Sequence, residues 1–199
     1  MLCVISAQCL IEAQAYGANR YDYVRYGYVK LNGVAVWQSS WHGEFRNRRG
    51  VTVIIVDPST CRMKESRSYD THGNTNAAAE LRDYLQGLSD GTVLVGVSCD
   101  EASCCLSDAL PTLSALGADV SDVGHRGAWV FAAQKGDSAK TVLDKQLTEA
   151  AANERQPRIT AIFAGVITVC TVTKKCWGDS PCQWKTPIFR PPLSVIESS

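Results

Sequence analysis

The sequence predicts an α/β fold that disulfide bonds stabilise. Runs of β-branched and aromatic residues alternate along the chain with amphipathic helical patterns, which is typical of an α/β domain. Nine cysteines among 199 residues indicate an oxidising compartment, in which disulfides persist. A hydrophobic content of 45% is enough to form one substantial core.

A hairpin is expected first. Residues 21–31 are rich in tyrosine and place alternate side chains on one face, which predicts a strand. Asn32-Gly33 is a signal for a two-residue hairpin turn, so residues 34–37 should return antiparallel to that strand.

The next segment predicts a buried strand followed by an exposed one. Residues 51–56 read VTVIIV, and such an unbroken β-branched run is typical of a strand covered on both faces. Asp57-Pro58 supplies a side-chain acceptor and a fixed φ, which predicts a reversal of the chain. Residues 61–69 then mix small and apolar residues with charged ones, as in a strand with one face in water.

Two helices and two strands alternate over the middle of the chain. Residues 92–98 and 128–132 are apolar runs that predict inner strands. The first helix is expected from apolar side chains at helical spacing, namely Leu81, Tyr84, Leu85 and Leu88. The second helix is expected from Leu106, Leu110, Leu113 and Leu116, with Gly117 as its C-cap.

Fewer sequence patterns indicate the secondary structure of the last part of the chain. Residues 141–153 indicate a weak surface helix, because only Leu143 and Leu147 form a large apolar pair at i, i+4. Residues 159–170 predict a last strand. We therefore expect one domain over residues 10–170, preceded by a segment, residues 1–9, that resembles the end of a signal peptide. A tail rich in Cys, Pro and Trp, residues 171–199, should pack on the domain.

Composition excludes several classes of partner. The 20 basic and 20 acidic residues cancel, so nucleic acid is not an expected partner, and no apolar stretch is long enough for membrane insertion. No Cys-x-x-Cys pair occurs and only three histidines are present, so no metal or other cofactor is expected. Because nine is odd, at least one thiol is free, bonds between chains or is lost if the extreme N-terminus is removed; a bond between chains would link a homodimer.

Short motifs between residues 10 and 136 occur in the order of a known domain. They are Arg49-Gly50-x-x-Val53, Asp57-Pro58, Asp70-Thr71-His72, Asp90-Gly91, Asp100-Glu101, Leu106-x-Asp108, Leu116-Gly117 and Gly124-x-Arg126-x-x-Trp129-x-Phe131. With these motifs the chain resembles the ILEI/FAM3 (PANDER-like) family. The resemblance implies a secreted or lumenal β-sandwich with flanking helices, as found in FAM3-type signalling proteins and cell-surface hyaluronidase-related proteins. It also occurs in the stem of a protein O-mannose N-acetylglucosaminyltransferase, where it binds sugar.

The resemblance also implies a site on two loops. The family's stem site uses the acidic residue of a Lys-Asp-Glu loop and the arginine of a Gly-x-Arg-Asp-x-Trp loop, which match Asp100 and Arg126. Cys99 stands here in place of the Lys, and Gly127 in place of the Asp. Independently, a carboxylate and a guanidinium can bind vicinal hydroxyls while an aromatic face covers a pyranose ring. If residues 92–98 and 128–132 form neighbouring strands, both loops leave the same edge of the sheet.

We therefore predict a ligand-binding site at one sheet edge. Its candidate residues are Asp100, Glu101, His125, Arg126 and Trp129. Alternatively, Arg126 pairs with Asp100 or Asp108 only to tie the loops together, and Trp129 belongs to the core.

The function that we predict is that of a secreted, lectin-like carbohydrate-binding protein whose partner is a glycan or glycoconjugate. The alternative is a FAM3-type signalling or matrix protein that binds a protein receptor. No catalytic residues are predicted, because His72 beside Asp70 is expected to form a structural pair and no nucleophile and base motif occurs. The adjacent Cys104 and Cys105, close to Cys99, are expected to take part in structural disulfides.

Overall fold

The computed structural model describes residues 2–5, 8–17, 26–40, 49–147, 157–164 and 168–171. The chain divides into two units, of which the smaller comprises Met1–Val4 and Val169–Ser199 and the larger Ile5–Thr168. The short strands β1 (Leu2–Ile5) and β12 (Thr168–Thr171) pair in a two-stranded sheet. All other described elements belong to the larger unit.

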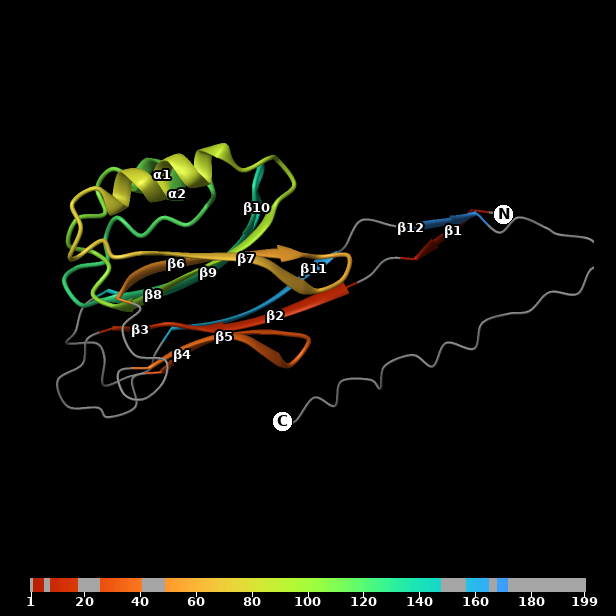
Figure 1. The fold of residues 1–199 in the computed structure, drawn as a ribbon, viewed down its shortest axis with the longest axis horizontal. Helices are drawn as coiled ribbons and strands as arrows, with labels where there is room; N and C mark the ends of the chain where they lie inside the picture. Colours follow the sequence, from red (N-terminus) through yellow and green to blue (C-terminus); the bar gives the residue numbers. More distant parts are fainter. Residues whose placement is uncertain are drawn as a thin grey trace, which may run out of the picture. The chain divides into compact units, whose positions relative to one another are not determined.

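The larger unit contains two sheets, which Figure 1 shows one above the other. The larger sheet has the order β10-β9-β8-β6-β7, with β3 paired alongside β8, and the smaller has the order β11-β2-β4-β5. The strands of the larger sheet are β3 (Tyr16–Gly17), β6 (Gly50–Asp57), β7 (Arg62–Tyr69), β8 (Val93–Asp100), β9 (Ala128–Gln134) and β10 (Asp137–Gln146). Those of the smaller sheet are β2 (Gln8–Gln14), β4 (Tyr26–Leu31), β5 (Val34–Ser40) and β11 (Arg158–Ala164). The pairing within both sheets is antiparallel, except that β3 runs parallel to β8.

The inner strands are apolar throughout because they are covered on both faces. In β9, Val130 lies in a core shared by the two sheets, whereas Trp129 and Phe131 lie in a second core on the opposite face. In β8, Val95 likewise lies in the core shared by the two sheets, and Leu94 lies in the second core. This alternation follows from the two-residue period of a strand, and it explains why the sequence pattern of these strands shows no polar face.

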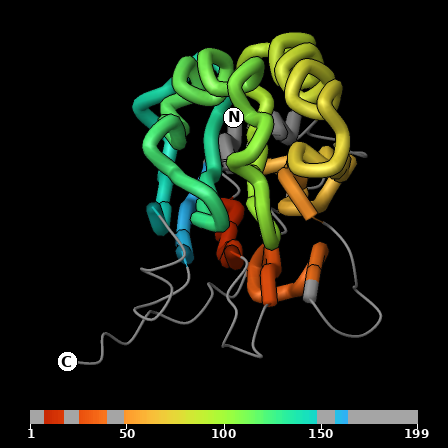
Figure 2. Tube along the Cα trace, turned by 90° about the vertical axis from the view of Figure 1, so that its left-hand side faces the viewer, coloured from red at the N-terminus to blue at the C-terminus, as the bar shows by residue number. Residues whose placement is uncertain are grey.

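Helices α1 (Ala77–Gly87) and α2 (Leu110–Ala115) cover the second core. Figure 2 shows them on the side of the larger sheet opposite to the β4–β5 hairpin, drawn in orange. Leu81 and Leu85 of α1 are fully buried, as is Leu113 of α2. α2 ends at Ala115, and Gly117 just beyond it has the predicted left-handed conformation, with a φ of 85°; the Ala118 amide then donates a hydrogen bond to the Leu113 carbonyl. The larger unit is therefore mostly β-sheet, with two mainly antiparallel sheets and helices on one outer face, which fits the predicted sandwich with flanking helices better than the α/β class as such.

The predicted hairpin is confirmed by β4 and β5. Asn32 and Gly33 have φ values of 48° and 79°, as a two-residue turn with both central residues left-handed requires. Residues 21–25 of the predicted first strand lie outside the described residues.

The structure corrects two of the predicted elements. The weak helix predicted at 141–153 is wrong for the described residues up to 147. This segment belongs mostly to strand β10, which pairs with β9 in a register that sets Leu143 opposite Phe131. Residues 148–153 lie outside the described part of the chain. The single strand predicted at 159–170 consists of β11 and β12, which belong to different sheets. Residues 8 and 9, assigned above to a separate N-terminal segment, lie in β2.

One disulfide connects the two sheets. Cys9 of β2 bonds to Cys61 in the β6–β7 turn, at a sequence separation of 52. Cys99, Cys104 and Cys105 are not disulfide-bonded, so the predicted structural disulfide at Cys104 or Cys105 is wrong. The remaining cysteines are Cys3, Cys170, Cys176 and Cys182, whose side chains are not described.

Of the predicted tail, residues 171–199, only the backbone of Thr171 is described, in β12. Among the described residues, neither helix has the length and hydropathy that a membrane span requires.

Candidate functional site

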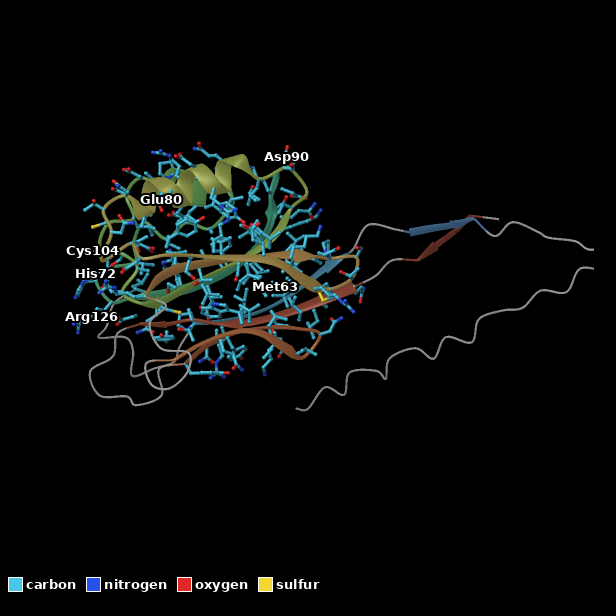
Figure 3. All side chains as sticks on the ribbon, in the orientation of Figure 1. Met63, His72, Glu80, Asp90, Cys104 and Arg126 are labelled. Carbon is cyan, nitrogen blue, oxygen red and sulfur yellow. A yellow bond between two sulfur atoms is a disulfide. The ribbon has the colours of Figure 1, made fainter. Side chains whose placement is uncertain are left out.

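The two predicted loops lie side by side at one end of the larger sheet. β8 and β9 are antiparallel neighbours, with Val97 opposite Val130, so the loop that leaves β8 and the loop that enters β9 share one sheet edge. Figure 3 shows Cys104 of the first loop and Arg126 of the second at the same end of the unit, away from Met63. We call Gly17 and residues 100–105 and 124–127 the rim.

Strand β3 contacts both loops. Gly17 pairs with Asp100, and a Cβ atom on Gly17 would lie 2.3 Å from the carbonyl oxygen of Arg126. The backbone of Asp100 and that of Arg126 therefore both lie against Gly17. The structure thus brings together the two residues on which the predicted site depends.

The backbone is strained at both of these residues. Asp100 has a φ of 62° and Arg126 a φ of 57°, in the left-handed region that side chains other than glycine rarely adopt. Each such residue costs roughly 1–2 kcal/mol. In the described part of the chain, Asn32 and Cys61, both in turns, are the other non-glycine residues with positive φ. Strain of this kind is concentrated at ligand-binding positions in proteins, which points to the rim as a functional surface.

Glu101 connects the two loops by hydrogen bonds. Its side chain is buried, and its Oε1 accepts hydrogen bonds from the amide and hydroxyl of Ser103 at 2.7 and 2.6 Å and from the amide of Cys104 at 3.1 Å. Its Oε2 accepts a hydrogen bond from the amide of Arg126 and lies 3.0 Å from Nδ1 of His125. Both carboxylate oxygens therefore accept hydrogen bonds from other groups of the protein. Glu101 was predicted to bind ligand, but in the structure it is a positioning residue that fixes the loops.

The surroundings of Glu101 keep its carboxylate ionised. Burial by itself would raise its pKa, but the hydrogen bonds from Ser103 and from the amide of Arg126, with the nearby imidazole of His125, lower the pKa below its ordinary value. A charged acceptor also strengthens each of the hydrogen bonds that hold the rim.

A second set of contacts supports the rim from β6 and β7. The hydroxyl of Thr71 donates to the carbonyl of Ala102 at 2.9 Å, in a buried position. Next to it, the guanidinium of Arg49 donates to both oxygens of Asp70, at 2.8 and 2.7 Å. The Asp70 carboxylate thus pairs with Arg49 and also accepts a backbone hydrogen bond from His72. The hydrogen bonds from Arg49, with a smaller contribution from that of His72, lower the pKa of Asp70. The role of Arg49 was missed because 21 residues separate the partners in sequence.

Trp129 does not present a face to a ligand, which corrects its place among the candidate residues. It is fully buried and stacks on Phe131, with ring centroids 5.9 Å apart. Its backbone amide donates to the hydroxyl of Ser98 at 2.7 Å. Trp129 therefore anchors the start of β9 beneath the rim.

The polar side chains that reach the surface are those of Asp100, His125 and Arg126. The side chain of His125 is 65% exposed, and residues Asp100 and Arg126 are half-buried. Together they offer a carboxylate, an imidazole and a guanidinium on adjacent loops. Such a set can accept hydrogen bonds from hydroxyls and donate to hydroxyls or carboxylates.

Comparison with known proteins identifies the domain. Residues 49–137, which include the loops of the rim, match the family model of the Interleukin-like EMT inducer (ILEI). Over 110 residues the chain is 30% identical to the human "Cell migration-inducing and hyaluronan-binding protein". That alignment covers 54% of this chain and 8% of the relative, so the chain spans a small part of the relative's length. The resemblance found in the motifs is therefore confirmed by the match of residues 49–137 to the ILEI family model.

Proposed function

We propose that this chain is a non-catalytic, lectin-like protein that binds a glycan at the rim. The observation that carries the proposal is the side-by-side placement of Asp100 and Arg126 on two loops that one buried carboxylate, Glu101, fixes together. Because the loops are held by hydrogen bonds before any ligand arrives, binding would cost little loop ordering.

The chemistry of the surface side chains suits a sugar. The carboxylate of Asp100 can accept hydrogen bonds from two neighbouring hydroxyls, and the planar guanidinium of Arg126 can donate two parallel hydrogen bonds. His125 adds a third polar group beside Arg126. Charge-assisted hydrogen bonds of this kind are about twice as strong as neutral ones.

The ligand class that we favour is an acidic glycan, with hyaluronan as the first candidate. The human relative is named as a hyaluronan-binding protein, and its alignment with this chain covers 110 residues. Hyaluronan carries a carboxylate on every second sugar, and a guanidinium such as that of Arg126 is the side chain best suited to bind a carboxylate with two hydrogen bonds.

We place this function outside the cell. The disulfide between Cys9 and Cys61 is of the kind that forms in oxidising compartments, and a signalling or matrix role fits the family that residues 49–137 match. The second candidate function is recognition of a protein receptor by the same rim, as the name of the family suggests. A homodimer stays a prediction in either case.

The proposal is tested by binding of the full chain to a glycan array and to immobilised hyaluronan. The variants are Asp100→Asn and Arg126→Asn, because asparagine tolerates a left-handed φ and so removes the charge while keeping the loop conformation. Each should weaken binding about tenfold or more, since each removes a charge-assisted contact. The matched controls are Asp90→Asn and Arg62→Ala, which remove the same charges at exposed positions away from the rim.

Saturable binding that competing sugar removes, and that depends on Asp100 and Arg126 but not on the controls, supports the proposal. A blank array, or equal binding by all four variants, contradicts it. A blank array together with binding to a protein that Arg126→Asn abolishes would favour the receptor alternative.

A further inference from the structure

Two neighbouring thiols on the rim are not used by the proposed function. Cys104 and Cys105 are both reduced, and their Sγ atoms lie 3.5 Å apart in a contact in which the Cys105 thiol donates to the Cys104 sulfur. Cys104 is exposed and Cys105 is half-buried. Cys99, which is not disulfide-bonded either, is buried in the core between the sheets. A small molecule in solution can therefore reach the Cys104 sulfur but not that of Cys99.

The loop holds the two thiols together. On one side, the amide of Cys104 and both polar groups of Ser103 are bound to Oε1 of Glu101. On the other side, Leu106 is buried in the core beneath the helices. The pair thus lies between two fixed points, and the closeness of the sulfur atoms follows from the loop conformation.

We propose that Cys104 and Cys105 are a site of reversible oxidation, at which exchange with a low-molecular-weight disulfide such as oxidised glutathione closes a vicinal disulfide. The Cys104 thiolate attacks one sulfur of the small disulfide, which forms a mixed disulfide and releases one small thiol. The Cys105 thiolate then attacks the Cys104 sulfur, which releases the second small thiol. Two protein thiols are oxidised by two electrons, and one small disulfide is reduced to two thiols.

The geometry explains why this bond would be reversible. To bond, the two sulfur atoms must approach from 3.5 Å to the ordinary disulfide length of about 2.0 Å. The Cα atoms of adjacent residues are only about 3.8 Å apart, which is closer than the usual range in disulfides, so the product is strained. Strained and exposed disulfides are the readily reduced ones, in contrast to structural disulfides.

Oxidation would also act on the rim. The amide of Cys104 and the amide of Arg126 are bound to the two oxygens of the same carboxylate, that of Glu101. A change in the Cys104–Cys105 peptide is thereby transmitted to the Arg126 loop. This consequence rests on the proposed glycan site, whereas the oxidation itself does not.

The test is non-reducing peptide mapping by mass spectrometry on the full chain, equilibrated with mixtures of reduced and oxidised glutathione. We expect the peptide that contains both cysteines to lose two hydrogen atoms in oxidising mixtures and to regain them in reducing ones. Cys105→Ser should stop at a mixed disulfide of glutathione with Cys104, because the resolving thiol is missing. The measurement is made on the fraction of protein in which the buried Cys99 stays unmodified, which ensures that the chain is folded.

A trivalent arsenical provides a second measurement that does not depend on oxidation. Phenylarsine oxide bridges two close thiols, so the reduced chain should bind it at the pair, and Cys104→Ser and Cys105→Ser should each abolish this binding. The proposal is overturned if oxidation leaves both thiols unchanged, gives each its own glutathione, or links either to another cysteine of this chain or of a second copy. Since all readouts are masses, failure of the glycan proposal would leave this result intact.

Discussion

Glu101 is the residue on which the geometry of the rim depends most, because one buried carboxylate accepts hydrogen bonds from both loops. Its pKa is lowered in the folded chain and returns to its ordinary value on unfolding. Above the ordinary carboxyl pKa, the ionised group therefore contributes its full stabilisation. That stabilisation is lost progressively as the pH falls from the ordinary pKa through the lowered one.

This leads to a prediction for Glu101→Gln. At neutral pH the variant should lose about 1–3 kcal/mol in its free energy of unfolding, because a neutral amide replaces a charged acceptor and turns one donor toward other donors. As the pH is lowered through the acid range, the difference from the parent chain should shrink, because the parent loses the same interaction. Urea unfolding at several pH values measures it. A difference that stays constant with pH would show that the charge of Glu101 plays no part.

The left-handed conformation of Arg126 gives a second prediction. Arg126→Gly and Arg126→Ala remove the same side chain, yet the glycine variant should be more stable by about 1 kcal/mol, because only glycine adopts a φ of 57° without strain. At Arg62, which lies in strand β7, the order should reverse, since glycine in a strand costs conformational entropy. Thermal unfolding of the four variants compares them. The same order at both positions would contradict the strain at residue 126.

At the scale of elements, the short strand β3 pairs with the end of β8 and contacts the loop that contains Arg126. Gly17 has room for no side chain, because the nearest atom to an added Cβ is a backbone oxygen of Arg126 at 2.3 Å. A flexible side chain could move away, but the backbone of a loop bound to Glu101 cannot do so without breaking hydrogen bonds. The contact between β3 and the Arg126 loop therefore requires glycine.

We predict that Gly17→Ala lowers the free energy of unfolding by roughly 1–3 kcal/mol, the usual cost of overpacking, and weakens glycan binding at the same time. Gly87→Ala is the matched control, because an added Cβ there meets open space at the end of α1. The control should be neutral or slightly stabilising, since alanine restricts the unfolded chain. Urea unfolding and hyaluronan binding of both variants are the measurements. Equal stability of the two variants would contradict the described packing of β3.

The elements differ in how much of them the sequence could predict. The runs at 51–56, 92–98 and 128–132 were predicted because strands covered on both faces need apolar residues at every position. β10 was taken for a helix because it is an edge strand with mixed exposure, and its residues follow neither period cleanly. Pairing with β9 decided its conformation, and such pairing is a property of the folded chain.

The residues of the site also differ in how far the sequence could predict their roles. Asp100 and Arg126 were predicted because they match two loops of the family that the motifs resemble, and their positions at the ends of recognisable inner strands supported that choice. The roles of Glu101 and Gly17 could not, because they depend on contacts with Arg126 across 25 residues in one case and more than 100 in the other. For Trp129 the sequence favoured a place in the core over contact with a sugar, and the residue is fully buried.

At the scale of the whole molecule, the Cys9–Cys61 disulfide ties the two sheets to each other. We predict that Cys9→Ala combined with Cys61→Ala lowers the free energy of unfolding by about 4 kcal/mol, because a closed loop of this length restricts the unfolded chain strongly. Cys104→Ser combined with Cys105→Ser, which removes two unbridged thiols, should change stability little. Denaturant midpoints under non-reducing conditions measure both. A double alanine variant as stable as the parent would show that the disulfide is dispensable for the fold.

The proposal that matters most for this chain is glycan binding at the rim, which is built from Gly17, Asp100 and Arg126. The most direct test is an NMR titration of the isotope-labelled full chain with a hyaluronan oligosaccharide, followed through its backbone amides. We expect saturable shifts that are concentrated at residue 17 and in residues 100–105 and 124–127. Shifts confined to the opposite end, near Arg62 and Asp90, or an unchanged spectrum at saturating sugar would contradict it.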